Sequence, residues 1–273
     1  MLLSKSNIEL VNNGSLRSSD VSLELTKRCN LKCSHCYLGE PEEIDMEPEI
    51  PDKVFEKIRE IAVIYLIGAE STLNPKGLAL IDKALGEHKV KFNTMSLVTN
   101  GTVLDKEFFE VLQSIYAKSS QGVTIGISNN GFHDAALKQA GITREEVYSN
   151  GEKLRKMYPQ FMIDDRVARG FGKGNIYASG RAKEFGHVQR PNRNVLATYF
   201  CNHHLGGKVM HSSLNNISIS THGNVVNDVT CNKESAKNIF GNVVTDKLSE
   251  ILKKHAYDSR THYLAAVEQD SIK

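Results

Sequence analysis

The sequence is short of cysteine, and it lacks the signals that would direct a chain into a membrane. Its 273 residues include only 5 cysteines, an odd number that does not suit a framework of disulfides. No apolar run approaches the roughly 18 residues of a membrane span, and the N-terminus has no sustained apolar stretch typical of a secretory signal. We therefore predict a cytoplasmic protein with no membrane partner, whose reduced cysteines serve metal or redox chemistry.

An excess of charge of one sign is also missing. The chain has 34 basic and 32 acidic residues, so its formal net charge is +2, and no long run of Lys or Arg occurs. A nucleic-acid partner is therefore not implied. Hydrophobic residues make up 40% of the chain, which is enough to bury the core of one large α/β domain, with or without a small appendage.

Segments with the period of a strand alternate with segments with the period of a helix along the first two thirds of the chain. The predicted strands are 21–25, 63–68, 94–101, 122–128 and a strand within 160–170. The predicted helices are 50–62, 74–88, 105–116 and helical stretches within 132–157. Strands that alternate with helices pair in parallel through right-handed crossovers, so the pattern predicts a parallel sheet or barrel of the α/β class.

The character of the sequence changes beyond residue 186. The string PNRN at 191–194 is typical of a linker, and the segment after it predicts a hairpin that turns at His222 to Asn224. We expect two domains, 1–189 and 190–273, of which the second is a small α+β unit. The last stretch, 246–273, has the pattern of a polar amphipathic helix.

Three of the five cysteines lie within nine residues, in the string CNLKCSHCY from Cys29 to Tyr37. Cys29, Cys33 and Cys36 follow the first predicted strand directly and have no fourth cysteine nearby. Structural zinc takes four ligands, and His35 is available as the fourth although it lies between two of the cysteines. An iron–sulfur cube with one open iron suits three thiolates better. Both metal sites remain open on the spacing alone.

The whole string, with the aromatic Tyr37 after the last cysteine, resembles the signature of the radical S-adenosylmethionine (radical SAM) enzymes. The resemblance implies a partial (β/α)6 TIM-like barrel and a [4Fe-4S] cluster held by Cys29, Cys33 and Cys36, with S-adenosylmethionine bound at the open iron. It also implies that a small electron donor such as a flavodoxin or ferredoxin reduces the cluster. The reduced cluster splits the cofactor into a 5′-deoxyadenosyl radical that abstracts hydrogen from a substrate. Tyr37 is expected beside the adenine.

The end of the second predicted strand is similar to the family's GGEP segment. Gly68, Ala69 and Glu70 occupy this place, with Ala69 for the second glycine and Ser71 for the proline. If the backbone at Ala69 needs a positive φ, the alanine costs about 1 kcal/mol. The resemblance implies that Glu70 accepts a hydrogen bond from the amino group of the cofactor.

Two further strand ends complete the predicted cofactor site. Asn100 lies in a TNG turn like the family's, and Ser128 matches a serine expected near the ribose or carboxylate of the cofactor. Asn130 stands where the family has an aspartate. Active-site residues of barrel folds follow the C-terminal ends of strands, as these residues do. The predicted cofactor-binding residues are Tyr37, Gly68, Ala69, Glu70, Asn100 and Ser128.

Three arginines are weaker candidates. Arg181, in GRAKEFG at 180–186, resembles the GRA segment that closes the barrel of peptide-modifying members. It is equally explained as a structural arginine that caps a helix or pairs with Glu184. Arg166 and Arg169 are candidate carboxylate ligands by charge alone.

The two remaining cysteines, Cys201 and Cys231, lie in a segment that resembles the start of a SPASM or twitch extension, which holds auxiliary iron–sulfur clusters. The chain lacks the downstream cysteines of a full SPASM domain. Three alternatives follow. The pair holds a second cluster together with an open iron or a histidine ligand; or the two are packed remnants, because free cysteine is often buried; or one donates a hydrogen atom to a substrate radical. The histidines available as ligands are His203, His204 and His222.

These observations favour a radical SAM enzyme that acts on a peptide, by maturation or epimerisation. The alternatives are a radical SAM enzyme that acts on a small molecule or nucleoside and a non-catalytic zinc-binding interaction module.

Overall fold

The structure, a computed structural model, describes residues 8–11, 15–128, 131–164, 180–185, 216–226, 239–248 and 251. Several predictions fall outside these residues: the linker at 191–194, most of the helix at 246–273, and the side chains of Asn130, Arg166, Arg169, Cys201, His203, His204 and Cys231. Among the helices in the described part of the chain, none has both the length and the hydrophobicity of a membrane span.

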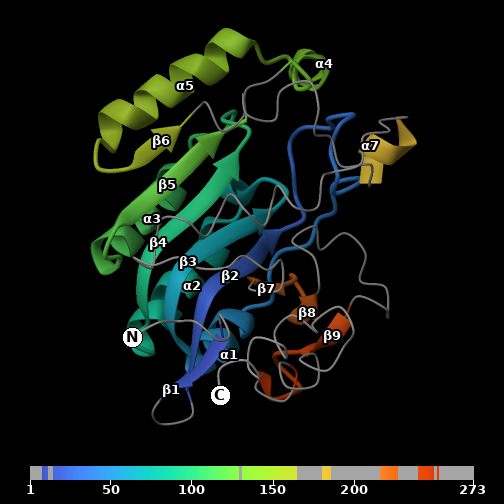
Figure 1. The fold of residues 1–273 in the computed structure, drawn as a ribbon. Coiled ribbons are helices and arrows are strands. Elements are labelled where there is room, and N and C mark those ends of the chain that lie inside the picture. Colours follow the sequence, from blue (N-terminus) through green and yellow to red (C-terminus); the bar gives the residue numbers. More distant parts are fainter. Residues whose placement is uncertain are drawn as a thin grey trace, which may run out of the picture.

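One sheet runs through the described part of the chain, in the order β6-β5-β4-β3-β2-β7-β8-β9, with β1 paired to β2 (Figure 1). Neighbouring strands are parallel from β6 through β2 to β7, whereas β1, β8 and β9 pair antiparallel. The strands are β1 Ile8–Val11, β2 Ser15–Thr26, β3 Ile58–Gly68, β4 Lys91–Thr99, β5 Gly122–Ile127, β6 Met162–Asp164, β7 Asn216–Ile219, β8 Asn224–Val226 and β9 Ile239–Asn242. The predicted α/β class is confirmed, and the sheet is open rather than closed.

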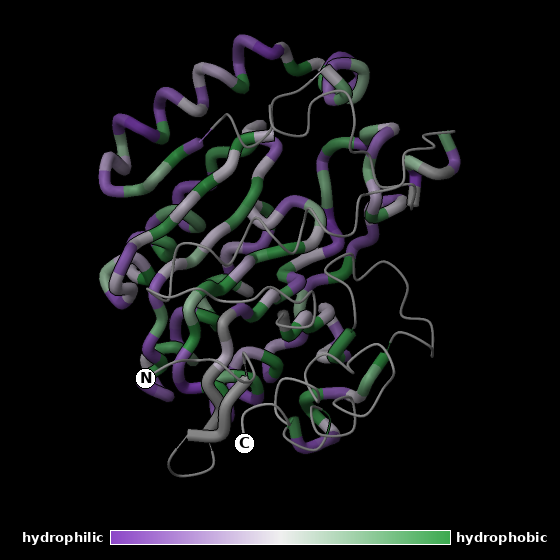
Figure 2. The backbone as a smooth tube through the Cα atoms, viewed as in Figure 1, coloured by the Kyte–Doolittle hydropathy of each residue, from purple (hydrophilic) through white to green (hydrophobic). Residues whose placement is uncertain are grey.

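Helices lie between the parallel strands along the chain. They are α1 Ile50–Lys57, α2 Pro75–Glu87, α3 Lys106–Lys118, α4 Asp134–Gln139, α5 Arg144–Met157 and the short α7 Gly180–Glu184, with a 3-10 turn η1 Ser71–Leu73. Side-chain caps begin three of them, because Asn74, Asp105 and Thr143 accept hydrogen bonds from backbone N–H groups of the first turn. Figure 2 shows green residues gathered on the strands and frequent purple along α5, the pattern of a helix with one solvated face.

One predicted helix is shorter than the sequence suggested. The helix predicted over 50–62 ends at Lys57, and β3 begins directly at Ile58, five residues before the predicted strand. The reason is pairing: Glu60 and Ile61 pair with residues of both β2 and β4. The backbone partners of two neighbouring strands outweigh the helical spacing of the apolar residues, because propensity is a weak prior.

Strand β2 positions the site because its two faces differ. Val21, Leu23 and Leu25 are fully buried in the main hydrophobic core. Glu24 and Thr26 alternate with them and are buried on the other face. The strand ends at Thr26, so the cysteine string begins at the carboxyl edge of the sheet.

The C-terminal strands continue the same sheet and the same core. The turn predicted at 222–224 is present: β7 and β8 form a hairpin, and Gly223 in the turn has φ +77°. β7 pairs in parallel with β2, and Ile217 and Ile219 lie in the main hydrophobic core with residues of β2. The proposed domain boundary near 189 lies outside the described residues and stays a prediction.

Candidate metal centre

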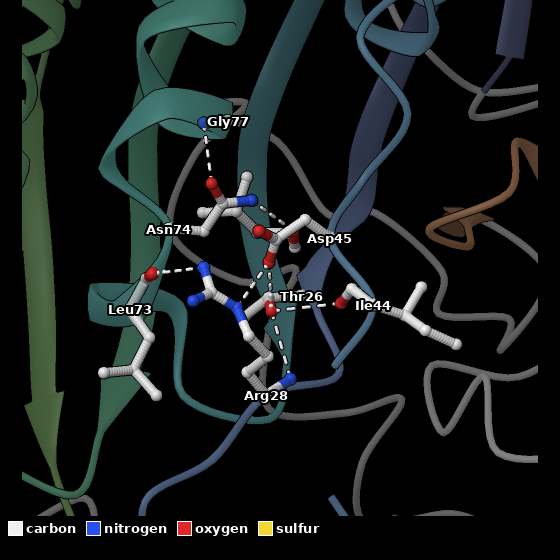
Figure 3. Close-up of polar contacts among 8 residues, drawn as sticks. Thr26, Arg28, Ile44, Asp45, Leu73, Asn74 and Gly77 are labelled. Carbon is white, nitrogen blue, oxygen red and sulfur yellow. Dashed lines mark hydrogen bonds and ion pairs between the residues drawn. The ribbon is translucent and has the colours of Figure 1, made fainter. Parts of the chain in front are cut away.

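Residues 27–45, here named the cysteine loop, leave β2 and return to it. The N–H of Lys27 donates to the carbonyl of Ile44 at 2.8 Å. The Asp45 carboxylate accepts from the Thr26 hydroxyl at 2.6 Å and from Arg28 Nε at 2.9 Å (Figure 3). Arg28 also donates to the carbonyl of Leu73, beyond the end of β3. The two ends of the loop are therefore fixed to each other and to the next strand connection.

All three cysteines of the loop pack into one small hydrophobic cluster. Cys33 is buried in it beside Leu31 and Ile127, and Cys29 and Cys36 pack against it half-buried. Burial raises the pKa of the Cys29 thiol to about 11 and that of the Cys33 thiol to about 12, and it also raises the pKa of Cys36. Thiolates at this site therefore need positive charge to stabilise them.

The surroundings of the sulfurs fit an iron–sulfur cluster. The N–H of Leu31 donates to Cys29 Sγ at 3.4 Å, and the N–H groups of Leu38 and Gly39 donate to the Cys36 thiol. Hydrogen bonds to sulfur and shielding from solvent are the means by which proteins tune such clusters. Within the described ranges, no three His, Cys, Asp or Glu side chains meet as ligands of one metal ion. A cube binds its three thiolates on three different irons, so these sulfurs need not meet at one ion.

The end of β3 is attached to the start of the cysteine loop. The N–H groups of Ala69 and Glu70 donate to the carbonyls of Thr26 and Arg28 at 3.0 and 2.9 Å. Gly68 has φ +110°, and a Cβ there would lie 2.4 Å from the carbonyl oxygen of Thr26. The positive φ thus falls on Gly68 and not on Ala69, since Lys89 is the only non-glycine with positive φ among the described residues. The strain considered for Ala69 is absent.

Glu70 is buried at the centre of a hydrogen-bond network. Its Oε1 accepts from the hydroxyls of Thr72 and Thr99, each at 2.7 Å, and its Oε2 accepts from the N–H of Asn100 at 2.7 Å. Burial raises the pKa of Glu70, although these donors oppose the rise. The carboxylate therefore ties the end of β3 to the end of β4.

Asn100 and Ser128 lie at the next strand ends. Asn100 Nδ2 donates to Asn30 Oδ1 at 2.9 Å and lies 3.9 Å from Cys29 Sγ. The N–H of Ser128 donates to the carbonyl of Thr99 at 2.8 Å. The structure thus brings Cys29, Glu70 and Asn100 into one contact network, with Ser128 on the adjoining strand end. Tyr37 lies half-buried on the cysteine loop.

Two histidines considered as metal ligands, His35 and His222, contact aromatic rings and a carboxylate in the structure. The ring of His35 lies edge-on to that of His133 with centroids 4.5 Å apart, and 5.4 Å from the ring of Phe132. His222, named as an alternative cluster ligand, has its Nδ1 2.9 Å from a carboxylate oxygen of Glu47.

Sequence reasoning missed Asp45, which closes the cysteine loop, and it named Arg181 without predicting that this residue holds the loop. Arg181 on α7 donates to the carbonyls of Lys32 and Cys33, both at 3.2 Å, and forms an ion pair with Glu40. This role differs from both alternatives drawn from the sequence, helix capping and a pair with Glu184. The only signal was the resemblance to the GRA segment, which did not indicate what the arginine contacts.

Known proteins resemble parts of this chain. The antilisterial bacteriocin subtilosin biosynthesis protein AlbA of Bacillus subtilis (strain 168) is 29% identical over 126 residues, which are 44% of this chain and 27% of that protein. The tungsten-containing aldehyde ferredoxin oxidoreductase cofactor-modifying protein of Pyrococcus furiosus is 33% identical over 99 residues, 34% of this chain and 27% of that protein. The matched segment thus spans about a quarter of each relative.

One solved structure shows the same fold. The crystal structure of Streptococcus suis SuiB aligns with a TM-score of 0.52 at 13% identity, over 92% of this chain and 69% of that one. SuiB bound to its precursor peptide SuiA aligns over 90% and 66% of the two chains, at 11% identity and a TM-score of 0.42. A model of the Radical SAM superfamily matches residues 23–164, just over half of the sequence, and the chain therefore belongs to the radical SAM superfamily.

Proposed function

We propose that this chain is an iron–sulfur enzyme that cleaves S-adenosylmethionine reductively and uses the product to abstract hydrogen from a substrate. The observation that carries the proposal is the packing of Cys29, Cys33 and Cys36 in one apolar cluster at the carboxyl end of β2. When bound there, the reduced [4Fe-4S] cluster and S-adenosylmethionine would supply a 5′-deoxyadenosyl radical.

The residues of the chain itself have three tasks in this proposal. The apolar cluster around the thiols keeps water away from the metal and from a reactive intermediate. Asn100, beside Cys29, orients that ligand and links it to the β4 end. Glu70 Oε2 accepts one described hydrogen bond, from Asn100, and a carboxylate oxygen accepts two, so it retains capacity for the amino group of the cofactor. We assign Tyr37, Gly68, Ala69 and Ser128 to the same cofactor pocket.

A peptide is the substrate class that we propose. Support comes from the name of AlbA, which places it in the biosynthesis of a bacteriocin, and from the complex of SuiB with a precursor peptide. Reduction by a small flavodoxin or ferredoxin is part of the same proposal, and a second cluster at Cys201 and Cys231 is one of the alternatives for those two cysteines.

Anaerobic reconstitution with iron and sulfide tests the chemistry. We expect a brown protein with about four irons at the triplet, which forms 5′-deoxyadenosine when dithionite and S-adenosylmethionine are added. Cys33→Ala should lose both iron and product, whereas Ser34→Ala, a matched change in the same loop, should keep them. A colourless protein that holds one zinc would contradict the proposal and favour the zinc-binding module.

Iron counting in a Cys29, Cys33 and Cys36 triple alanine variant separates the alternatives for the other two cysteines. About four residual irons would indicate an auxiliary cluster, and no residual iron would indicate a packed remnant or a hydrogen-atom donor.

A second candidate function is the modification of a small molecule or cofactor. The name of the Pyrococcus furiosus relative, a cofactor-modifying protein, favours it. Mass spectrometry of peptides encoded beside the gene, after incubation with the reduced enzyme, decides between the two: a mass change in such a peptide supports the peptide substrate.

A further inference from the structure

Arg181 is enclosed by the cysteine loop. Its Nε and Nη2 donate to the carbonyls of Cys33 and Lys32, its Nη1 pairs with Glu40, and the ring of Phe185 lies 5.2 Å from the guanidinium carbon. Only 11% of the side chain is exposed. Every nitrogen of the guanidinium therefore has a partner on the loop that carries the thiols.

The charges around Arg181 do not cancel its effect on the thiols. Glu40, its counter-ion, is 55% exposed and also lies 3.5 Å from the ammonium of Lys32, which is 60% exposed. Solvent screens both of these groups in part, so Glu40 reduces the effect of the shielded Arg181 charge without cancelling it. Its guanidinium donates to the carbonyl of Cys33 itself, so its positive charge lies beside a proposed ligand of the cluster.

We propose that Arg181 is a positioning residue of the metal centre, which fixes the backbone between Lys32 and Cys33 and supplies the charge that favours reduction of the cluster. Reduction transfers one electron from an external low-potential donor to the cluster, so the reduced form carries one more negative charge. A shielded positive charge nearby stabilises that form more than the oxidised form. The inference rests on the proposed [4Fe-4S] cluster at Cys29, Cys33 and Cys36.

A second contact lets the charge be removed while the loop stays attached. The N–H of Ala182 donates to the carbonyl of Cys36 at 2.9 Å, and this backbone bond does not depend on the side chain of Arg181. Substitution of Arg181 therefore leaves α7 connected to the loop.

The test is a dithionite titration of the reconstituted full chain, followed by electron paramagnetic resonance. In Arg181→Met we expect the equilibrium constant for one-electron reduction to fall about tenfold, which corresponds to a midpoint about 59 mV more negative. Arg181→Lys retains the charge and should shift the midpoint less. Glu40→Gln removes the counter-ion and should move the midpoint in the opposite direction. Arg144→Met, which removes a surface arginine paired with Asp134, should leave the midpoint unchanged.

The midpoint shifts expected for Arg181→Met and Glu40→Gln have opposite signs, which separates a charge effect from a loss of structure. Equal midpoints in the wild type and Arg181→Met overturn the inference. If Arg181→Met takes up no iron, Glu40→Gln decides: a more positive midpoint supports the inference, and an unchanged or more negative one overturns it. A wild-type chain that binds no cluster would instead contradict the proposed function.

Discussion

Gly68 shows how a single residue fixes the approach of a strand to the cysteine loop. Its φ is +110°, and an added Cβ would lie 2.4 Å from the backbone oxygen of Thr26. We expect Gly68→Ala to lower the free energy of unfolding by about 2–4 kcal/mol, because the positive φ and the clash both cost free energy. Gly141→Ala is the matched control, since Gly141 has φ +70° and open space around it.

Urea unfolding of the two variants measures the difference. In the control, Gly141→Ala, the free energy of unfolding should fall only by the cost of a positive φ, about 1–2 kcal/mol. Equal losses in both variants would show that Gly68 is not needed for the close approach.

Glu70 gives the stability of the chain a dependence on pH. Burial raises its pKa in the folded chain, so the unfolded chain releases this proton at a lower pH. The stability that protonated Glu70 contributes is therefore present below the ordinary glutamate pKa of about 4.3 and is lost as the pH rises through the folded value. Relative to Glu70→Gln, which does not titrate, the wild type should become less stable as the pH rises above about 4. A difference that stays constant with pH would contradict this assignment.

The sequence predicted the site residues unevenly, for a physical reason. Spacing and residue type predicted Cys29, Cys33 and Cys36. Their places at strand ends predicted Glu70 and Asn100. Arg181 and Asp45 have no such pattern. Arg181 donates to a carbonyl 148 residues earlier in the chain, and Asp45 accepts from a side chain 17 residues earlier. Every residue offers a carbonyl, so the backbone contacts of Arg181 leave no signature in the sequence. The side chains that donate to Asp45 are likewise not marked by any pattern around it.

At the scale of elements, the closure of the cysteine loop depends on Asp45. Its carboxylate accepts hydrogen bonds from Thr26 and Arg28, but it is partly exposed, so we expect Asp45→Asn to cost only about 1 kcal/mol of stability. The larger effect should be faster loss of iron from the reconstituted protein, because the two ends of the loop separate more easily. Asp134→Asn, which breaks an exposed pair with Arg144, is the control and should not change iron retention.

The cap of helix α2 joins that helix to β2. Asn74 accepts from the N–H of Gly77 and donates to the carbonyl of Leu25, both at 2.9 Å and both buried. We expect Asn74→Ala to cost about 2–3 kcal/mol, because it removes a cap and leaves a buried carbonyl unpaired. Thr143→Ala removes an exposed cap from α5 and should cost about 1 kcal/mol. Equal costs, measured by urea unfolding, would mean that the link to β2 contributes nothing.

At the scale of the whole molecule, the order of strands along the chain was easier to predict than their neighbours. Alternation of periods indicated β2 to β6 and their helices, since each strand pairs with the next in the sequence. The hairpin of β7 and β8 was also predicted from its turn. Its place beside β2 was not, because β7 has only four residues and lies almost 200 residues from its partner in the sequence. The side chains of so short a strand do not specify which edge it joins.

The position of β7 beside β2 predicts that the C-terminal strands unfold cooperatively with the rest of the sheet. Ile219 is fully buried in the core that also holds Leu23 and Leu25 of β2. If the C-terminal strands unfold with the rest of the sheet, Ile219→Ala should lower the free energy of unfolding by about 2–5 kcal/mol in a single transition. It should also raise amide exchange in β2 and β3. Met157→Ala, at an exposed site on α5, should change neither. Two separate transitions, with only one of them shifted by Ile219→Ala, would show instead that 190–273 folds as an independent domain.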